Sequence, residues 1–552
     1  MPAIRASAAL FLQRVQASSR DPAGIASIGF SGFLALKFKM ASFMAAFSNS
    51  GKNNSHRLVT TWYNYHCMLF NSITFLWLFL PVLLVLYYSI GKIFPKTKNY
   101  ILLFFSLIFY AWGEPVYVLL MIASIIVNYV FGLLIDRARR KKKKKQKVLW
   151  LVLDIVFNVG LLGHFKYFNF LVANINGVFG AGTLTIGEIA LPIGISFYTF
   201  QVMSYVIDLY RGEIKVQKNL SKLALYVSFF PQLIAGPIVK YHDIDKALSS
   251  RKETTEKFAY GVKRFIYGLA KKVLIADVMA AVVDTIFVPK AGAMGLTQPV
   301  AWLGAICYAL QIFFDFSGYS DMAIGLGSMF GFKFMENFNL PYISSSITEF
   351  WRRWHMSLST WFKEYIYIPL GGNRKGKART YINLWIVFLV TGIWHGAAWV
   401  FIVWGIFHGF FIFVERLGLK KLLDKLYVLN HVYAMLVVLV GWVIFRAPSL
   451  KYALRYLKVM VFGAPANTIP IQLYTVVNHR TIITVIVGIL FCGIIQTILH
   501  KISESEKYKK KYLKVSSFCV RYIEPFALLG LSVLCIMAIV SNTYTSFIYF
   551  RF

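Results

Sequence analysis

Long apolar segments separated by short polar loops fill this chain from residue 68 to its end. A helix needs about 20 predominantly apolar residues to cross a bilayer, and many of these segments approach that length. The pattern predicts an all-α polytopic membrane protein with about 11 to 13 transmembrane or re-entrant helices. The predicted segments are residues 73–90, 100–112, 116–135, 148–171, 189–209, 223–238, 260–283, 300–316, 382–400, 401–413, 432–445, 482–499 and 525–540.

Several of these segments are too short or too polar to cross a membrane alone. Residues 231–244 (PQLIAGPIVKYHDI) place two prolines and a glycine inside an apolar run. Non-helical backbone is tolerated at membrane depth only inside the protein or beside a water-filled cavity. We therefore expect re-entrant or half-buried elements here.

Basic residues concentrate in the loops. Residues 91–99 and 136–147 (DRARRKKKKKQK) are both basic, and an apolar hairpin lies between them. The positive-inside rule places both loops in the cytoplasm, so the first span runs inward and whatever precedes it lies outside. Residues 1–67 are rich in Arg and Lys and would be hard to translocate. We therefore expect them to be an N-terminal extension outside the functional protein, with residues 68–552 forming one membrane domain.

For the extension, a misassigned start, a targeting segment rich in Arg and Ser, and a separate domain are the alternatives.

Composition supports the membrane class, because 58% of the 552 residues are hydrophobic and 15% are charged, against about 25% charged in soluble domains. The net charge of +36 does not favour nucleic acid as a partner, because its basic residues fall in short runs between apolar segments. The five cysteines lack C-x-x-C spacing, which favours buried small side chains over a disulfide framework or a zinc site.

Two carboxylates lie inside an apolar segment, Asp315 and Asp321 in FFDFSGYSDMAIGLG. A charge at the bilayer centre costs about 2.5 to 3.5 kcal/mol on insertion scales. Such groups usually face a cavity or a partner charge, and we expect Arg352 or Arg353 to be that partner. The same segment carries small residues that predict close helix packing: Ser317, Gly318, Ser320, Ala323, Gly325 and Gly327.

A helix is predicted to start after Ser344–Ser346, because Glu349 follows at capping-box spacing. On one continuous helix, four polar residues would form a single stripe: Thr348, Arg352, His355 and Ser359. Such a helix suits the membrane interface, with its stripe toward a cavity or toward headgroups. The alternative is a plain interfacial anchor, with tryptophans at headgroup level and arginines on phosphate.

A second candidate is His395 in TGIWHGAAW, deep in an apolar segment. A satisfied core histidine is the alternative, but Gly392, Gly396, Ala397 and Ala398 would leave room for a ligand to reach the ring. His408 follows 13 residues later. On an ideal helix it points roughly 140° away, so we expect it not to share a site with His395.

A neutral imidazole in an enclosed apolar site can take a proton from an attacking hydroxyl, a role worth roughly 10² to 10⁴ in rate. The chain contains no G-x-S-x-G elbow, no H-E-x-x-H and no Walker lysine motif. Serine hydrolase, metal and nucleotide phosphate chemistry are therefore unsupported, and we predict no metal site.

Five segments together carry a resemblance: PQLIAGPIVKY, FFDFSGYSDMAIGLGSMFGF, NFNLPYISSSITEFWRRWHMSLSTWFKEYIYIPLGGNR, TGIWHGAAWVFIVWGIFHG and the terminal FIYFRF. They resemble the membrane-bound O-acyltransferases, within them the alginate O-acetyltransferase subgroup, which is related to the D-alanyl transferase of teichoic acids. The resemblance implies a helix bundle around a transmembrane tunnel. It also implies that His395 is the catalytic histidine and that His355 is its companion at the cytoplasmic end.

With that role go the residues expected to bind substrate or line the tunnel, namely Arg352, Arg353, Trp351, Trp354, Trp394, Asp315 and Asp321. The resemblance further implies acetyl coenzyme A as a cytoplasmic donor substrate, with no bound cofactor. An extracytoplasmic SGNH-type acetyltransferase is the expected partner, which SFIYFRF at the C-terminus would face. The expected setting is the lipid of a bacterial inner membrane.

The function expected on these grounds is O-acetylation of an exported polysaccharide. One alternative keeps the scaffold but transfers an acyl or D-alanyl group from a carrier-protein thioester to a cell-wall polymer. The other is a non-enzymatic polysaccharide transporter that uses the same intramembrane charges.

Overall fold

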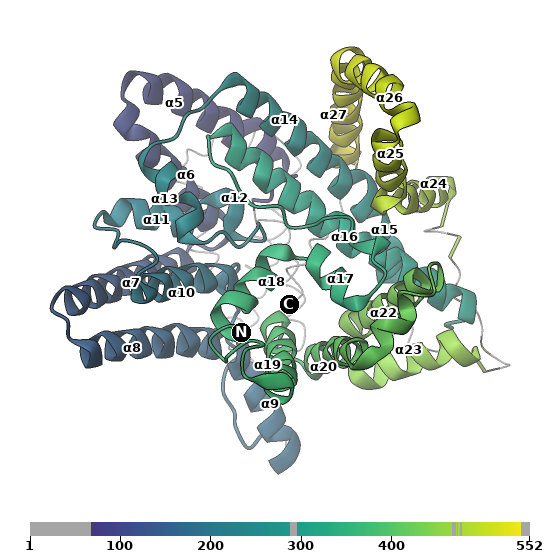
Figure 1. Cartoon of the computed structure of the whole chain (residues 1–552), viewed down its shortest axis with the longest axis horizontal. Coiled ribbons are helices and arrows are strands. Elements are labelled where there is room, and N and C mark those ends of the chain that lie inside the picture. The colour runs from purple at the N-terminus through teal and green to yellow at the C-terminus, as the bar shows by residue number, and fades with distance from the viewer. Residues whose placement is uncertain are drawn as a thin grey trace, which may run out of the picture.

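A computed structural model describes residues 68–541, with gaps at 181, at 288–294 and at several positions between 466 and 476. The predicted extension 1–67 and the terminal SFIYFRF lie outside the described residues. Every regular element among the described residues is a helix (Figure 1). The N-terminal half contains η1 Phe75–Phe79, α5 Leu80–Ile93, η2 Pro95–Thr97, α6 Lys98–Gly113, α7 Tyr117–Arg140, α8 Lys144–Leu162, η3 Gly163–Tyr167, α9 Phe168–Phe179, α10 Ile195–Arg211, α11 Leu220–Ser228, α12 Phe230–Leu233, α13 Tyr241–Ser249, α14 Thr255–Ala270, η4 Lys271–Ala276 and α15 Asp277–Ile286.

The remaining helices follow in the same way. They are α16 Gln298–Met329, η5 Pro341–Ile343, α17 Ile347–Arg353, α18 Met356–Phe362, η6 Lys363–Tyr367, α19 Gly376–His395, α20 Trp399–Val414, η7 Glu415–Leu419, α21 Lys420–Leu423, α22 Leu429–Arg446, α23 Leu450–Phe462, α24 His479–Ile489, η8 Leu490–Ile494, α25 Ile495–Glu504, α26 Glu506–Phe518, η9 Cys519–Ile523 and α27 Glu524–Ser541.

Eight helical stretches of the described chain are long and apolar enough to cross a membrane, which confirms the predicted all-α polytopic class. Several of them join two or three elements across a local π-helical turn. They are Phe75–Ile93, Tyr117–Arg140, Lys144–Phe179, Gln298–Met329, Trp399–Leu423, Leu429–Arg446, His479–Glu504 and Glu506–Ser541.

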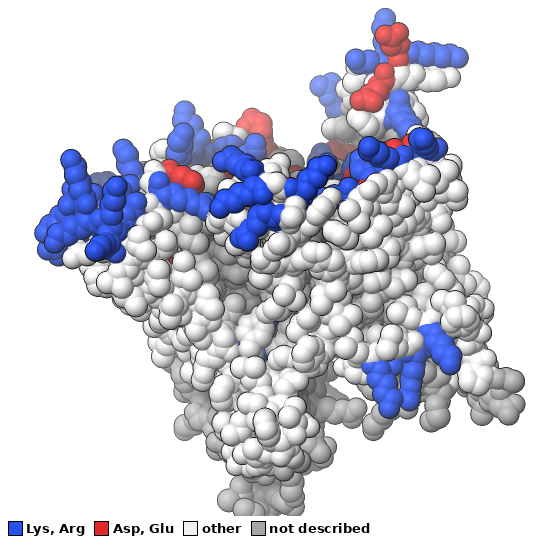
Figure 2. All heavy atoms as spheres, turned by 60° about the horizontal axis from the view of Figure 1, so that its bottom comes forward, with Lys and Arg blue, Asp and Glu red and all other residues white. Residues whose placement is uncertain are grey.

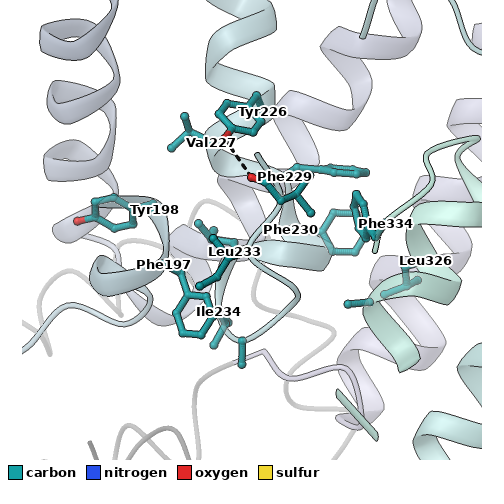
Figure 3. Packing of buried hydrophobic residues seen from close by; sticks show 14 of the residues in the cluster. Phe197, Tyr198, Tyr226, Val227, Phe229, Phe230, Leu233, Ile234, Leu326 and Phe334 are labelled. Atoms are coloured by element: carbon teal, nitrogen blue, oxygen red, sulfur yellow. Dashed lines mark hydrogen bonds between the residues drawn. The ribbon is translucent and has the colours of Figure 1, made fainter. Parts of the chain in front are cut away.

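The broken element expected at 231–244 is present and lies inside the protein. α11 ends at Ser228, the one-turn helix α12 follows, and the chain then runs without regular structure to α13. Residues 225–241 are all buried. Figure 3 shows the aromatic packing around this break, where the Tyr226 hydroxyl donates to the Val239 carbonyl at 3.0 Å. The irregular backbone is thus shielded by protein, as membrane depth requires.

The long helix α16 runs through the centre of the molecule and packs closely on α14. A Cβ built on Gly318 would lie 2.7 Å from the Gly268 carbonyl oxygen, and one on Gly325 would lie 2.6 Å from the Gly261 carbonyl oxygen. Only glycine permits backbones this close. The predicted packing role of the small-residue ladder is therefore confirmed at these two positions.

Charged side chains gather at the two ends of a broad apolar band (Figure 2). Most of the Lys and Arg in that view lie along one face, which includes the α7–α8 turn, where residues 141–146 are exposed. Helices α25 and α26 project beyond this face as an arm (Figures 1 and 2). We call this surface the basic face.

Candidate active site

His355 lies at a break between two short helices. α17 ends at Arg353, Trp354 is extended, and His355 has a left-handed backbone with φ 44° and ψ 54° before α18 begins at Met356. The predicted N-cap is confirmed, because the Ser346 side chain accepts from the Glu349 N–H at 3.1 Å. The predicted continuous helix is wrong, and with it the polar stripe. Periodicity cannot reveal one residue that leaves helical geometry.

The break turns His355 into the protein instead of along a surface. Its side chain is 1% exposed. The imidazole packs edge-on against Phe316 with ring centroids 4.7 Å apart, and it lies 6.2 Å from the Trp394 ring. Asn337 Oδ1 lies 3.1 Å from His355 Nδ1. Sequence reasoning missed Asn337, because nothing in its local pattern separates it from a loop residue.

His395 lies at a second break. α19 ends at His395, Gly396 is extended with φ −173° and ψ 157°, and α20 starts at Trp399. The ring is enclosed by aromatic side chains, with centroid distances of 5.0 Å to Trp394, 4.9 Å to Trp404 and 5.3 Å to Phe445. Its Nε2 is buried and has no hydrogen-bond partner among the described residues.

Two of the glycines around His395 serve helix packing, which we did not expect, because α20 fills the space that a side chain would take at Gly392 and Gly396. A Cβ on Gly392 would collide with the Phe401 carbonyl oxygen, and one on Gly396 would collide with the Phe401 ring. Gly405 of α20 approaches α19 equally closely. These glycines therefore let α19 and α20 pack closely against each other. This packing sets the direction of the chain at the break that carries His395.

Two side chains from η3 hold the end of α19. Lys166 Nζ donates to the Trp394 carbonyl at 2.5 Å and to Ser196 Oγ at 3.2 Å, and the Tyr167 hydroxyl donates to the Ile393 carbonyl at 2.7 Å. The last carbonyls of a helix lack partners within it, so these donors satisfy them. Sequence reasoning missed Lys166, although a lysine inside a predicted span was a visible signal.

His408 lies nearer to this region than we predicted. Trp404 contacts both His395, at 4.9 Å, and His408, at 5.1 Å between ring centroids. The prediction assumed one ideal helix from His395 to His408. The extended backbone at Gly396 changes the direction of the chain, so the angle computed for a continuous helix does not apply.

The predicted tunnel residues are placed in different surroundings. Trp394 contacts both candidate histidines, and Trp351 packs on Trp404 and His408 at 5.5 and 5.3 Å. Trp354 packs on Trp442 at 4.8 Å. Trp351 and Trp354 are both buried inside the protein, so they do not face headgroups as the alternative of an interfacial anchor requires. Their large apolar surface is buried instead by packing against other aromatic side chains inside the helix bundle.

The expected ion pairs are also different. Asp315 pairs with Lys272 at 2.8 Å, and Asp321 pairs with Lys271 at 2.6 Å and with Arg264 at 2.7 Å. These partners come from α14 and η4, which pack along α16. Arg353 instead pairs with Glu349 at 2.8 Å, one helical turn away. Arg352 is exposed. The break after Arg353 separates both arginines from the α16 carboxylates.

Within the described residues, no group of three His, Cys, Asp or Glu side chains is placed to hold a metal ion. The chemistry available is that of two imidazoles inside an apolar, aromatic surrounding. Both imidazoles lie in a multi-pass helical membrane protein, and both contact the Trp394 ring. The Nε2 atoms of both rings are buried, and this combination is suited to proton transfer in a largely apolar surrounding.

Comparison with known proteins identifies the family of this chain. Residues 212–454, which include both breaks, match the model of MBOAT, the membrane-bound O-acyltransferase family. The chain is 48% identical over 397 residues to the probable alginate O-acetylase of Pseudomonas aeruginosa, covering 71% of this chain and 75% of that protein. The chain therefore belongs to the membrane-bound O-acyltransferase family, and it is an enzyme of the acyltransferase class.

Two further relatives indicate how broad the likeness is. The peptidoglycan O-acetyltransferase of Helicobacter pylori is 38% identical over 430 residues, covering 71% of this chain and 80% of that protein. The teichoic acid D-alanyltransferase of Bacillus subtilis is 31% identical over 228 residues, covering 39% of this chain and 56% of that protein. The likeness to the acetyltransferases thus extends over much more of the chain than the likeness to the D-alanyltransferase. The predicted resemblance to the membrane-bound O-acyltransferases, and to the alginate O-acetyltransferases among them, is confirmed.

Proposed function

We propose that this protein moves acetyl groups from a cytoplasmic donor toward an exported polysaccharide for its O-acetylation. One observation carries the proposal: Trp394 is in ring contact with both His355 and His395, although the two histidines come from different helix breaks. The extensive likeness to an alginate O-acetylase and a peptidoglycan O-acetyltransferase supports acetyl as the group and a polysaccharide as the acceptor.

In the proposed reaction, His395 is the general base and His355 assists it. The attacking hydroxyl gives its proton to an imidazole nitrogen while its oxygen bonds to the acetyl carbonyl carbon. The C–S bond of a thioester donor breaks, and the sulfur takes up the proton. General base catalysis of this kind is worth roughly 10² to 10⁴ in rate. Trp394 would form the wall between the histidines, and Trp351 would support His395 through Trp404, which contacts both.

We assign the basic face to the cytoplasm of a bacterial inner membrane, because the positive-inside rule places Lys and Arg there. Acetyl coenzyme A is our candidate donor, because its phosphates would be attracted to that face. The donor would reach the histidines through a tunnel, with Arg352 and Arg353 near its entrance. An SGNH-type acetyltransferase on the other side would receive the acetyl group.

The first experiment tests the enzyme and its candidate base. Cells expressing the protein are compared with cells expressing His395→Ala, at matched protein levels, by the acetyl ester content of their exported polysaccharide. His500→Ala is the matched control, because His500 is an exposed residue of α25. We expect esters to fall at least about 100-fold in His395→Ala and to stay unchanged in His500→Ala. Persistent acetylation in His395→Ala would rule out the proposed base.

The second experiment identifies the donor. Purified protein in lipid vesicles receives either labelled acetyl coenzyme A or an acylated carrier protein, with an acceptor hydroxyl supplied. We expect label transfer from acetyl coenzyme A. Transfer only from the carrier protein would favour the D-alanyl type of chemistry. Loss of polymer export with esters intact, in a deletion strain, would favour the transporter.

A further inference from the structure

The Asn337 side chain makes an unusually complete set of hydrogen bonds beneath His355. Its Oδ1 lies 3.1 Å from His355 Nδ1, accepts from the Ser357 hydroxyl at 2.9 Å and accepts from the Ser357 backbone N–H at 3.3 Å. Its Nδ2 donates to Ser320 Oγ at 3.1 Å. Asn337, His355, Ser357 and Ser320 are all buried. The network therefore lies inside the protein, where a mispaired polar atom is costly.

The orientation of the Asn337 amide follows from one obligate donor. A backbone N–H can only donate, so the Asn337 atom that faces the Ser357 N–H must be oxygen. The same oxygen faces His355 Nδ1. An amide oxygen carries no proton, so the hydrogen of that contact belongs to the imidazole. The neutral His355 ring is therefore protonated at Nδ1 and bears its lone pair on Nε2.

The alternative assignment fails at the same oxygen. The Ser357 hydroxyl also lies 3.4 Å from His355 Nδ1, and it accepts from the Ile238 backbone N–H at 3.0 Å. If this hydroxyl donated to Nδ1, the unprotonated Nδ1 and Asn337 Oδ1 would face each other with two lone pairs at 3.1 Å. With the Ser357 hydroxyl and the His355 Nδ1–H both donating to Asn337 Oδ1, no two lone pairs face each other in this network.

We propose that Asn337 is a positioning residue that fixes the tautomer of His355. His355 Nε2 is buried and has no hydrogen-bond partner among the described residues. With Nδ1 occupied by Asn337, any proton or O–H hydrogen bond from a reacting molecule reaches His355 at Nε2. The role of that nitrogen in transfer rests on the proposed acetyltransferase function, whereas the tautomer does not.

The same geometry makes Asn337 different from a residue that only packs. A carboxylate in its place keeps both acceptor contacts to Ser357 and the contact to Nδ1, while Ser320 Oγ turns from acceptor to donor. An aliphatic side chain of the same length removes all four. Asn337→Asp and Asn337→Leu therefore separate hydrogen bonding from volume. The matched control is Asn339→Leu, the same change two residues later at an exposed side chain.

The first measurement is direct. Protein with ¹⁵N-labelled histidine in lipid vesicles gives ring nitrogen resonances by solid-state NMR, and the His355 signals are those lost in His355→Gln. We expect one protonated nitrogen hydrogen-bonded as Nδ1–H and one bare Nε2 at neutral pH. A protonated Nε2 in the unmodified protein overturns the inference. This measurement needs no active enzyme, so it stands apart from the proposed function.

The second measurement is the pH profile of acetyl transfer. We expect Asn337→Leu to lower the rate of acetyl transfer at least about 100-fold, because a His355 ring with a mixed tautomer no longer always presents the Nε2 lone pair with which it assists His395. Asn337→Asp should retain activity within about tenfold of the unmodified protein, and its acidic limb should move to higher pH because the carboxylate stabilises the imidazolium. Asn339→Leu should match the unmodified protein in both respects.

Three further results overturn the inference. One is a His355 tautomer that is unchanged in Asn337→Leu, and another is unchanged transfer by that variant. The third is an Asn337→Asp protein as inactive as Asn337→Leu with no shift of the pH profile, which would make Asn337 structural alone. Wild-type protein with the expected tautomer but no acetyl transfer from any donor would support the inference and contradict the proposed function.

Discussion

The two helix breaks hold their histidines by opposite means. At the α17–α18 break, His355 is fixed by a hydrogen bond that its ring donates to the buried Asn337 amide oxygen, and by a left-handed backbone. At the α19–α20 break, His395 is surrounded by three aromatic rings, and Lys166 and Tyr167 hold the helix end before it. One imidazole is oriented by polar contacts, the other by shape. The difference predicts which substitutions each break tolerates.

The largest effect should come from the rings themselves. We expect His355→Gln and His395→Gln each to lower acetyl transfer roughly 10² to 10⁴-fold. If both breaks serve one site, the double variant should be at most about tenfold worse than the worse single variant, because residues that act as a unit are not additive. Acetyl ester per unit of membrane protein is the measurement, with His500→Gln as control. Losses that multiply in the double variant would mean two independent sites.

Volume should matter most at the α19–α20 break. Gly392→Val adds side-chain atoms against the Phe401 carbonyl and α20. We expect it to lower stability by about 1 to 3 kcal/mol through overpacking, and to lower transfer by misplacing His395. Thermal unfolding in detergent measures the first effect. The matched control is Gly160→Val in α8, where a Cβ meets no atom within 4 Å. Equal unfolding midpoints for the two variants would contradict a packing role for Gly392.

A smaller effect is expected from the cation that caps α19. Lys166→Met keeps the apolar stem and removes the donor to the Trp394 carbonyl. We expect a loss of about 1 to 3 kcal/mol, typical of a hydrogen bond to a charged group, and a fall in transfer of roughly tenfold. Unfolding and transfer are measured together. Lys145→Met, at an exposed residue in the first turn of α8, should change neither. Normal transfer by Lys166→Met would show that aromatic packing alone orients His395.

The smallest effect concerns the polar start of α17. Burial acts to raise the pKa of Glu349, but hydrogen bonds from Ser345 and the charge of Arg353 outweigh it, so the pKa is lowered. A depressed carboxyl pKa stabilises the fold above the unfolded pKa, about 4.3 for glutamate. That contribution is lost as pH falls through the folded pKa.

Glu349→Gln should therefore be less stable than the unmodified protein by about 0.5 to 1 kcal/mol near neutral pH. The two should converge as pH falls below about 4.3. Thermal midpoints across this pH range check the prediction, with the exposed Glu213→Gln as control. A stability difference that is constant with pH would exclude the ion pair and carboxylate hydrogen bonds as its cause.

Local patterns foretold several features that the structure contains. Long apolar runs specified the spanning helices, and Ser346 with Glu349 specified where α17 begins. Prolines and a glycine in 231–244 specified the buried break after α12. Each of these depends on residues close together in the chain. Such features are set by backbone propensity, capping and apolar length, which a sequence contains directly.

Local sequence patterns could not predict which residues pair with the buried charged side chains. Asp315 lies beside Lys272, which comes from the turn after α14, and not beside the arginines that follow it along the chain. Lys272 was a detectable candidate, because it lies inside a predicted span and ionisable residues there are seldom unpaired. Lys272 pairs both with the nearby Asp277 and with Asp315 of α16. The second pairing depends on the register of α14 against α16, set by glycines of both helices such as Gly268 and Gly318.

The sequence by itself determined that this is a helical membrane protein of the membrane-bound O-acyltransferase family, and it singled out His355 and His395. Only the tertiary structure decided that both histidines lie at helix breaks, that Trp394 lies between them, and that Asn337 orients one of them. The physical reason is range. Helix length and composition are local, whereas the direction of a side chain at a break depends on packing between segments far apart in the chain.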